Sequence, residues 1–88
     1  MENIVTFRKK IDAIDEKIVL LLKQRMDLCR QIGAIKAEKG LAVKDIRRED
    51  AVYLNVMAKA LEVSLDPQKV EEIFKDIIAL GVLVQGAE

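Results

Sequence analysis

The stretch IVTFRKKIDAIDEKIVLLLKQRMDLCRQIGAIKAEK, residues 4–39, decides the fold. It contains no proline, and its one glycine is Gly33. Apolar residues recur in steps of three and four, which is typical of a helix that packs along one face. This apolar seam consists of Ile4, Phe7, Ile11, Ile14, Ile18, Leu21, Leu28, Ile32 and Ile35. We therefore predict one unbroken helix from Ile4 to Lys39, which ends at Gly40.

The length of this helix predicts a second copy of the chain. Thirty-six residues at about 1.5 Å each give a rod of roughly 54 Å. A compact globule of this chain length has a radius of gyration of about 12 Å, and hence a diameter of roughly 31 Å. The helix overhangs any core that the chain builds alone, so we expect a homodimer. A helix that breaks and folds back is the alternative, but no turn signal between Asp12 and Glu38 supports it.

Two shorter helices follow, and no segment alternates with period two for long enough to predict a strand. Asp45 is a predicted N-cap for a helix from about Ile46 to Glu62. Asp66 and Pro67 predict the start of a third helix, which runs from Pro67 to about Gln85. The fold class is all-α, and residues 1–88 form a single domain. The apolar stripe of the second helix is Ala51, Leu54, Ala58 and Leu61, with Val52 and Met57 beside it. The core stripe of the third is Val70, Ile73, Phe74, Ile77, Ile78 and Gly81.

Composition argues against several classes of partner. Lys plus Arg equals Asp plus Glu at 15 each, so the basic excess of a nucleic-acid-binding protein is missing. The single cysteine, Cys29, allows no intrachain disulfide, which fits a reducing compartment. The longest apolar run of the first helix, residues 18–22, is too short to span a bilayer, and residues 1–10 lack the apolar core of a signal peptide. We expect a cytoplasmic protein that binds neither nucleic acid nor membrane.

The available chemistry is narrow. Without histidine the chain has no Ser–His or Cys–His nucleophile pair. One cysteine and scattered carboxylates give no zinc spacing, and no glycine-rich phosphate loop is present. An enzyme built on this sequence would hold its substrate and place charge, with no metal and no cofactor.

Two cations of the long helix are candidates for such a site. Arg25 occupies a position in the apolar seam between Leu21 and Leu28. It is either a functional cation or a polar residue that fixes the helix register at some cost in stability, and the residues alone favour neither. Lys36 lies about 16 Å further along the axis and within about 20° of the same face, so both side chains can reach one small anion. Its alternative role is to complement the helix dipole.

The other candidates lie further apart in the sequence. Arg8 is about 25 Å from Arg25 and roughly 100° around the helix, so it can reach only the site of a partner chain in an antiparallel pair. Its alternative is a solvated first-turn residue. The remaining candidates are polar residues near helix ends, with capping or surface exposure as their alternatives: Asp45, Arg48, Glu49 and Gln85. Met26 and Cys29 flank Arg25, and we expect both to serve packing.

Three segments together carry a family resemblance. The segment FRKKIDAIDEKIVLLLKQRMDLCRQIGAIKAEKG, residues 7–40, resembles the first helix of the all-α class of chorismate mutase, including Arg8, Arg25, Gly33 and Lys36. The segment VKDIRRE, residues 43–49, is similar to the family's second motif. LDPQKVEEIFKDII, residues 65–78, followed by GVLVQ, residues 81–85, is similar to the third.

The resemblance implies an intertwined helical homodimer, whose long first helices span both subunits and build two equivalent sites. It also implies an isomerase of the shikimate pathway, which rearranges chorismate to prephenate for phenylalanine and tyrosine biosynthesis. One C–O bond breaks while one C–C bond forms within a single molecule, so no nucleophile, metal or cofactor is needed. Association with another enzyme of the pathway is compatible with a mutase of this size.

The resemblance assigns roles to the cations and to one amide. Chorismate is a dianion, and Arg25 together with Arg8 of the partner subunit should hold its carboxylates. Lys36 and Gln85 should donate hydrogen bonds to the ether oxygen, which gains negative charge in the transition state. Because Gln85 is uncharged where some relatives carry glutamate, activity should not require acid.

The resemblance also covers the start of the second helix. Asp45 and Glu49 should orient the ring hydroxyl, and Arg48 should support Glu49 and the anion-binding field. Gly81 stands where some relatives have serine, so no side-chain contact is available from that position. Two alternatives are an isochorismate-pyruvate lyase of the same fold and a non-catalytic helical dimerisation module. Asp45, Arg48 and Glu49 favour the mutase over the lyase.

Overall fold

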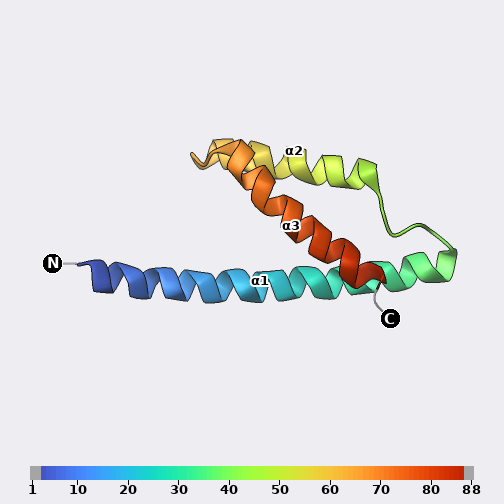
Figure 1. The fold of residues 1–88 in the computed structure, drawn as a ribbon, viewed down its shortest axis with the longest axis horizontal. Helices are drawn as coiled ribbons and strands as arrows, with labels where there is room; N and C mark the ends of the chain where they lie inside the picture. Colours follow the sequence, from blue (N-terminus) through green and yellow to red (C-terminus); the bar gives the residue numbers. More distant parts are fainter. Residues whose placement is uncertain (1–2, 87–88) are drawn as a thin grey trace.

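The computed structural model describes residues 3–86, which form three helices and contain no strand (Figure 1). Helix α1 spans Ile4–Lys39, α2 spans Ile46–Glu62 and α3 spans Pro67–Gly86. The predicted all-α class and the bounds of α1 and α2 are confirmed, and α3 ends one residue later than predicted. The ends of the predicted single domain, residues 1–2 and 87–88, lie outside the described residues.

Local signals in the sequence set the helix ends. Gly40 follows α1 in the left-handed conformation with φ of 68°, which a residue without Cβ adopts at little cost. The Asp45 side chain caps α2, because its Oδ1 accepts a hydrogen bond of 3.0 Å from the Arg48 backbone N–H. Oδ1 of Asp66 accepts one of 2.9 Å from the Gln68 backbone N–H at the start of α3. The predicted stop at Gly40 and the cap at Asp45 are confirmed.

Helix α3 holds the chain together. It packs against both α1 and α2, whereas no Cα atom of α1 lies within 8 Å of one in α2. In Figure 1, α3 runs obliquely from the far end of α2 down to α1. The buried apolar residues lie mostly along these two contacts: Met26, Cys29, Val52, Ala60, Ile78 and Val84. Packing by Met26 and Cys29 is confirmed.

Two predicted stripes differ from the buried faces. Leu54 and Leu61 of α2 are exposed. The buried residues are Val52, predicted beside the stripe, and Ala60, which was not predicted, because α3 contacts α2 on their side. Ile73, predicted in the core stripe of α3, is 59% exposed. The predicted stripes therefore include residues that nothing covers within one chain.

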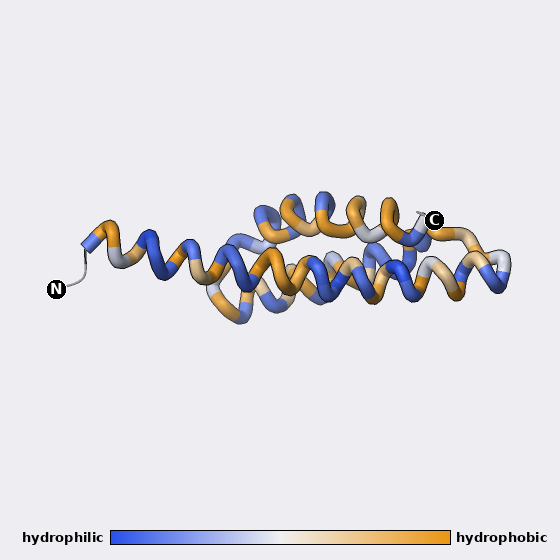
Figure 2. Tube along the Cα trace, turned by 90° about the horizontal axis from the view of Figure 1, so that it is seen from below, coloured by the Kyte–Doolittle hydropathy of each residue, from blue (hydrophilic) through white to orange (hydrophobic). Residues whose placement is uncertain are grey.

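The seam of α1 is also uncovered. Every apolar residue of the seam is between 46% and 66% exposed. Figure 2 shows apolar residues recurring along the N-terminal half of α1, which extends beyond the other two helices. No helix within residues 3–86 is long and apolar enough to cross a bilayer.

The chain is too extended for a compact monomer. Its radius of gyration is 16.3 Å and its extents are 58 × 26 × 15 Å, whereas a compact chain of this length has a radius of gyration of about 12 Å. It exposes 7206 Å², compared with roughly 5200 Å² for a compact monomer of this size. The difference of roughly 2000 Å² is about what one partner buries in a large obligate interface.

Gly33 allows α1 and α3 to approach closely. A Cβ atom at Gly33 would lie 2.6 Å from Cα and 2.8 Å from the carbonyl carbon of Gln85. These are backbone atoms, so no change of side-chain rotamer could relieve the overlap. The absence of a side chain at Gly33 therefore fixes where the last turns of α3 lie on α1.

Replacing Gly33 by alanine should destabilise the protein. Overpacking costs about 1–3 kcal/mol, which exceeds the roughly 0.5–1 kcal/mol that alanine gains over glycine inside a helix. Urea unfolding should show the loss. Gly86→Ala is the matched control, because a Cβ at Gly86 meets no atom within 4 Å. Equal midpoints for the two variants would contradict the close approach.

Candidate active site

A cavity of about 390 Å³ lies between α1, α3 and the start of α2. Its volume lies within the range of small-molecule sites. Six of the seven predicted site residues line it: Arg25, Lys36, Asp45, Arg48, Glu49 and Gln85. Its apolar walls include Leu28, Ile32, Val52, Ile78 and Val82. The cavity thus combines cations and carboxylates with apolar walls, which suits a small, charged, partly apolar ligand.

One face of α1 supplies both an apolar wall and two of the cations. Arg25, Leu28, Ile32 and Lys36 follow one another at steps of three and four, so a single helix face carries all four into the cavity. Leu28 and Ile32, predicted only as residues of the apolar seam, are therefore also wall residues of the cavity.

The Arg25 side chain fills space that Gly81 leaves free. Its Nη1 lies 4.0 Å from the Sγ atom of Cys29, a long contact between the half-buried arginine and a buried thiol. A Cβ atom at Gly81 would lie 3.1 Å from the same Nη1 and 3.1 Å from the same Sγ. The missing side chain at Gly81 therefore gives the guanidinium its room at the cavity wall.

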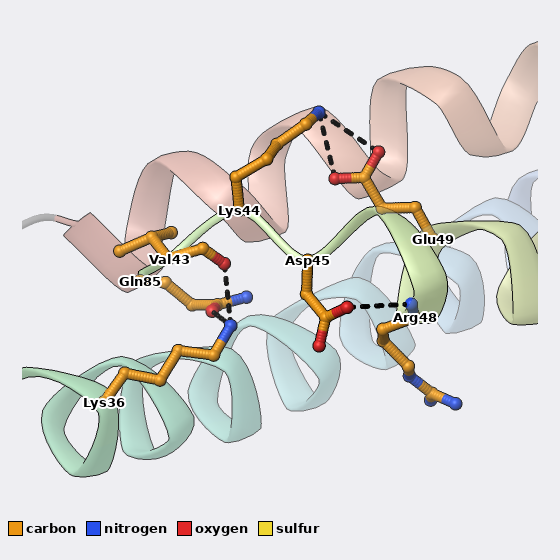
Figure 3. A network of polar contacts seen from close by, with 7 residues as sticks. All are labelled: Lys36, Val43, Lys44, Asp45, Arg48, Glu49 and Gln85. Atoms are coloured by element: carbon orange, nitrogen blue, oxygen red, sulfur yellow. Dashed lines mark hydrogen bonds and ion pairs between the residues drawn. The ribbon is translucent and has the colours of Figure 1, made fainter. Parts of the chain in front are cut away.

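Lys36 ties three parts of the chain together (Figure 3). Its half-buried Nζ donates a hydrogen bond of 2.7 Å to Oε1 of Gln85 and another of 2.7 Å to the Val43 carbonyl. An ammonium group has three N–H donors, so one remains for a ligand. Because Oε1 accepts from Lys36, the amide nitrogen of Gln85 is also left to donate. Two donors from different helices therefore lie side by side.

The start of α2 carries the carboxylates. Oδ1 of Asp45 is engaged as the helix cap, and Glu49 stands one turn further along. Nζ of Lys44 lies 3.1 Å from Oε1 of Glu49 and 3.0 Å from Oε2. In Figure 3 the Arg48 side chain extends away from the Glu49 carboxylate. The cation in direct contact with the Glu49 carboxylate is therefore Lys44, whereas Arg48, to which the family resemblance gives support of Glu49 and of the anion-binding field, lines the same cavity.

One predicted site residue lies outside the cavity, and two residues that take part in contacts at the site were not predicted. Arg8 is exposed on the N-terminal half of α1 and does not line the cavity, as its helical separation from Arg25 predicted. The carbonyl of Val43 and the ammonium of Lys44 were not predicted. No periodic signal could have found them, because both belong to the irregular connection between α1 and α2.

The chain is similar to known proteins over most of its length. The model of the family described as chorismate mutase type II matches residues 7–86. A chorismate mutase of Methanocaldococcus jannaschii is 32% identical over 78 residues, which cover 89% of this chain and 79% of that protein.

Other relatives are longer and are named as bifunctional enzymes. A bifunctional chorismate mutase/prephenate dehydratase of Aquifex aeolicus is 34% identical over 82 residues, which cover 90% of this chain and 23% of that protein. The bifunctional chorismate mutase/prephenate dehydratase of Escherichia coli K12 is 32% identical over 84 residues, which cover 96% of this chain and 22% of that protein. The chain therefore spans less than a quarter of these bifunctional relatives.

Proposed function

Because the chain belongs to the chorismate mutase type II family, we propose that the cavity between α1, α3 and the start of α2 is its active site. The chain is an isomerase that rearranges chorismate to prephenate, a step of aromatic amino-acid biosynthesis. In this reaction the ether C–O bond breaks as a C–C bond forms within the same molecule, and no atom is gained or lost. The protein therefore needs to hold a reactive conformer and to stabilise developing charge.

Two arginines hold the two carboxylates of the substrate. Arg25 suits the first role, since its planar guanidinium can bind a carboxylate through two parallel hydrogen bonds. Its half-buried place beside Gly81 limits its motion. The second clamp is Arg8 of the partner subunit. Fixing both carboxylates brings the two reacting carbons into a near-attack geometry.

Lys36 and Gln85 stabilise the ether oxygen as it gains negative charge. The observation that carries this proposal is the hydrogen bond of 2.7 Å from Nζ of Lys36 to Oε1 of Gln85. It turns the amide so that its nitrogen is available to donate, next to the remaining N–H of the ammonium. Donors that are already in place cost no reorganisation when the charge develops. Neither donor needs to be protonated by acid.

Glu49 and Asp45 orient the ring hydroxyl. The Glu49 carboxylate accepts a hydrogen bond from the ring hydroxyl, because ionised carboxylates are strong acceptors. One oxygen of Asp45 is already engaged at the helix cap, so Asp45 contributes with its remaining oxygen or its backbone. Arg48 adds positive charge to the cavity that receives the dianion.

A homodimer completes two such sites. Support comes from the exposed seam of α1 and from the roughly 2000 Å² of surface beyond that of a compact monomer. Two α1 helices that pack side by side would cover both seams and bring Arg8 of the partner subunit to the cavity. Residues 1–88 act as one mutase domain in the cytoplasm. Fusion to prephenate dehydratase in relatives supports association with another pathway enzyme.

The activity itself is tested with purified protein. Chorismate should disappear and prephenate should form without an added metal or cofactor. Isochorismate is the second substrate of the assay, and salicylate from isochorismate without prephenate from chorismate would overturn the proposed reaction in favour of a lyase. Binding of neither compound would favour the dimerisation module.

Mixed dimers test the shared site. Arg8→Ala removes one clamp from the partner's site, whereas Lys36→Ala disables the site of its own chain. A hybrid of the two variants has one intact site and one doubly defective site. Co-expression should therefore restore about a quarter of the wild-type rate, since half of the dimers are hybrids with one working site each.

The matched control pairs two variants that disable the same chain's site. Lys36→Ala with Arg25→Ala leaves no intact site in any dimer, so co-expression should restore nothing. Recovery no greater with Arg8→Ala than with Arg25→Ala would show that Arg8 does not act across the interface, even if the wild-type protein is active.

A further inference from the structure

The Glu49 carboxylate is held from outside the cavity by a residue that does not line it. On the basis of the proposed function, we propose that Lys44 is a positioning residue, which sets the orientation in which Glu49 meets the substrate hydroxyl. In Figure 3 the Lys44 side chain reaches from the connection to both oxygens of Glu49. Lys44 itself is absent from the cavity lining, so it acts through Glu49 and not on the substrate.

Burial makes this ion pair asymmetric. The Glu49 side chain is 16% exposed, whereas that of Lys44 is 62% exposed. The ammonium therefore keeps most of its contact with water, while the carboxylate has given up most of its own. A carboxylate in this position depends on its partner for orientation more than a solvated one does.

Both oxygens of Glu49 contact the ammonium of Lys44, and one of them is buried. Oε1 accepts a hydrogen bond from Lys44. Oε2 lies 3.0 Å from the same ammonium as an ion pair, but it is buried and accepts no hydrogen bond from any residue within 3–86. A buried acceptor without a donor is uncommon in folded proteins. The ammonium of Lys44 at 3.0 Å is therefore the positive charge that offsets the burial of this oxygen.

The backbone on either side of Lys44 is fixed. The preceding carbonyl, of Val43, accepts the hydrogen bond from Lys36, and the following residue, Asp45, caps α2. Lys44 is therefore anchored between two hydrogen-bonded neighbours rather than on a free loop. The same contacts that place Lys36 thus also determine where the Lys44 side chain starts.

A surface ion pair elsewhere in the chain provides the contrast. Nζ of Lys59 lies 3.1 Å from Oε1 of Glu62, and both side chains are about two-thirds exposed, at 67% and 68%. Pairs of this kind contribute little to stability. The length of the Lys44–Glu49 contact is similar, so what distinguishes it is the burial of the carboxylate and its place in the cavity wall.

A double-mutant cycle tests the proposal on the intact protein. The variants are Lys44→Met, Glu49→Gln and the two combined, each assayed for chorismate turnover and thermal unfolding. Lys44→Met should lower kcat/KM by about tenfold through misplacement of Glu49. In the Glu49→Gln background the same change should have little further effect, because the group through which Lys44 acts has already been altered.

Two further variants complete the experiment. Lys44→Arg, which retains the cation, should recover most of the activity, and Lys59→Met should match wild type. Far-ultraviolet circular dichroism should show the helix content of wild type in Lys44→Met, so that the loss of activity is not a loss of fold. Additive losses in the cycle would overturn the proposal and show that Lys44 attracts the anionic substrate directly. A wild-type rate in Lys44→Met would overturn it as well, whereas an inactive wild-type protein would refute the proposed function instead.

Discussion

Lys36→Ala should lower kcat for chorismate by about 10²–10³-fold, the usual cost of removing one donor to a developing oxyanion. The substitution removes the ammonium donor. It also releases Oε1 of Gln85, so the amide is no longer turned with its nitrogen toward the cavity. Loss of chorismate absorbance in the purified variant measures the effect, and far-ultraviolet circular dichroism checks that the helices remain.

Lys39→Ala is the matched control for this loss. Lys39 lies in the last turn of the same helix, is exposed, and is absent from the cavity lining. It should therefore keep the wild-type rate. If Lys36→Ala turned over chorismate as fast as Lys39→Ala, the role assigned to the ammonium would be wrong.

Arg25→Leu should change activity and stability in opposite directions. Activity should fall by about 10²-fold, because charge-assisted hydrogen bonds to a carboxylate contribute about 1.5–3 kcal/mol. Stability should rise by about 1 kcal/mol, because leucine completes the apolar seam between Leu21 and Leu28 and removes a partly desolvated cation. Chorismate turnover and urea unfolding measure the two effects separately.

Arg30→Leu separates the site from a general effect of charge. Arg30 is on the same helix, its side chain is 56% exposed, and it lies beside Asp27 outside the cavity. Its replacement should leave both turnover and the unfolding midpoint near those of wild type. A rise in stability at Arg25 without any loss of turnover would identify that arginine as a register residue alone.

The helices could be predicted because their ends depend on local chemistry. Gly40, Asp45 and Pro67 each act within a few residues of their own position. The buried faces could be predicted only in part. Leu54 of α2 follows the same periodicity as a core residue, but it is exposed in the single chain because α3 contacts the other side. Periodicity shows that a face is apolar and does not show what covers it.

The site residues could likewise be predicted only in part. Arg25 and Lys36 share one helix, so the helical rise and turn were enough to place them together. Gln85 received its role only from the family resemblance, since no local signal links the end of α3 to Lys36 in the last turn of α1. Lys44 was missed because its position depends on the path of the connection, which has no period.

The contact between Gly33 and Gln85 has a consequence for redesigning the enzyme. It is made with backbone atoms of Gln85, and the Gln85 side chain is not used in it. The location of the donor is thus determined by residue 33, while its chemical nature is determined by residue 85. A designer could exchange the group at 85 to suit a different substrate and leave the helix arrangement as it is. No such freedom exists at 33, where any larger residue would move every group that α3 brings to the cavity.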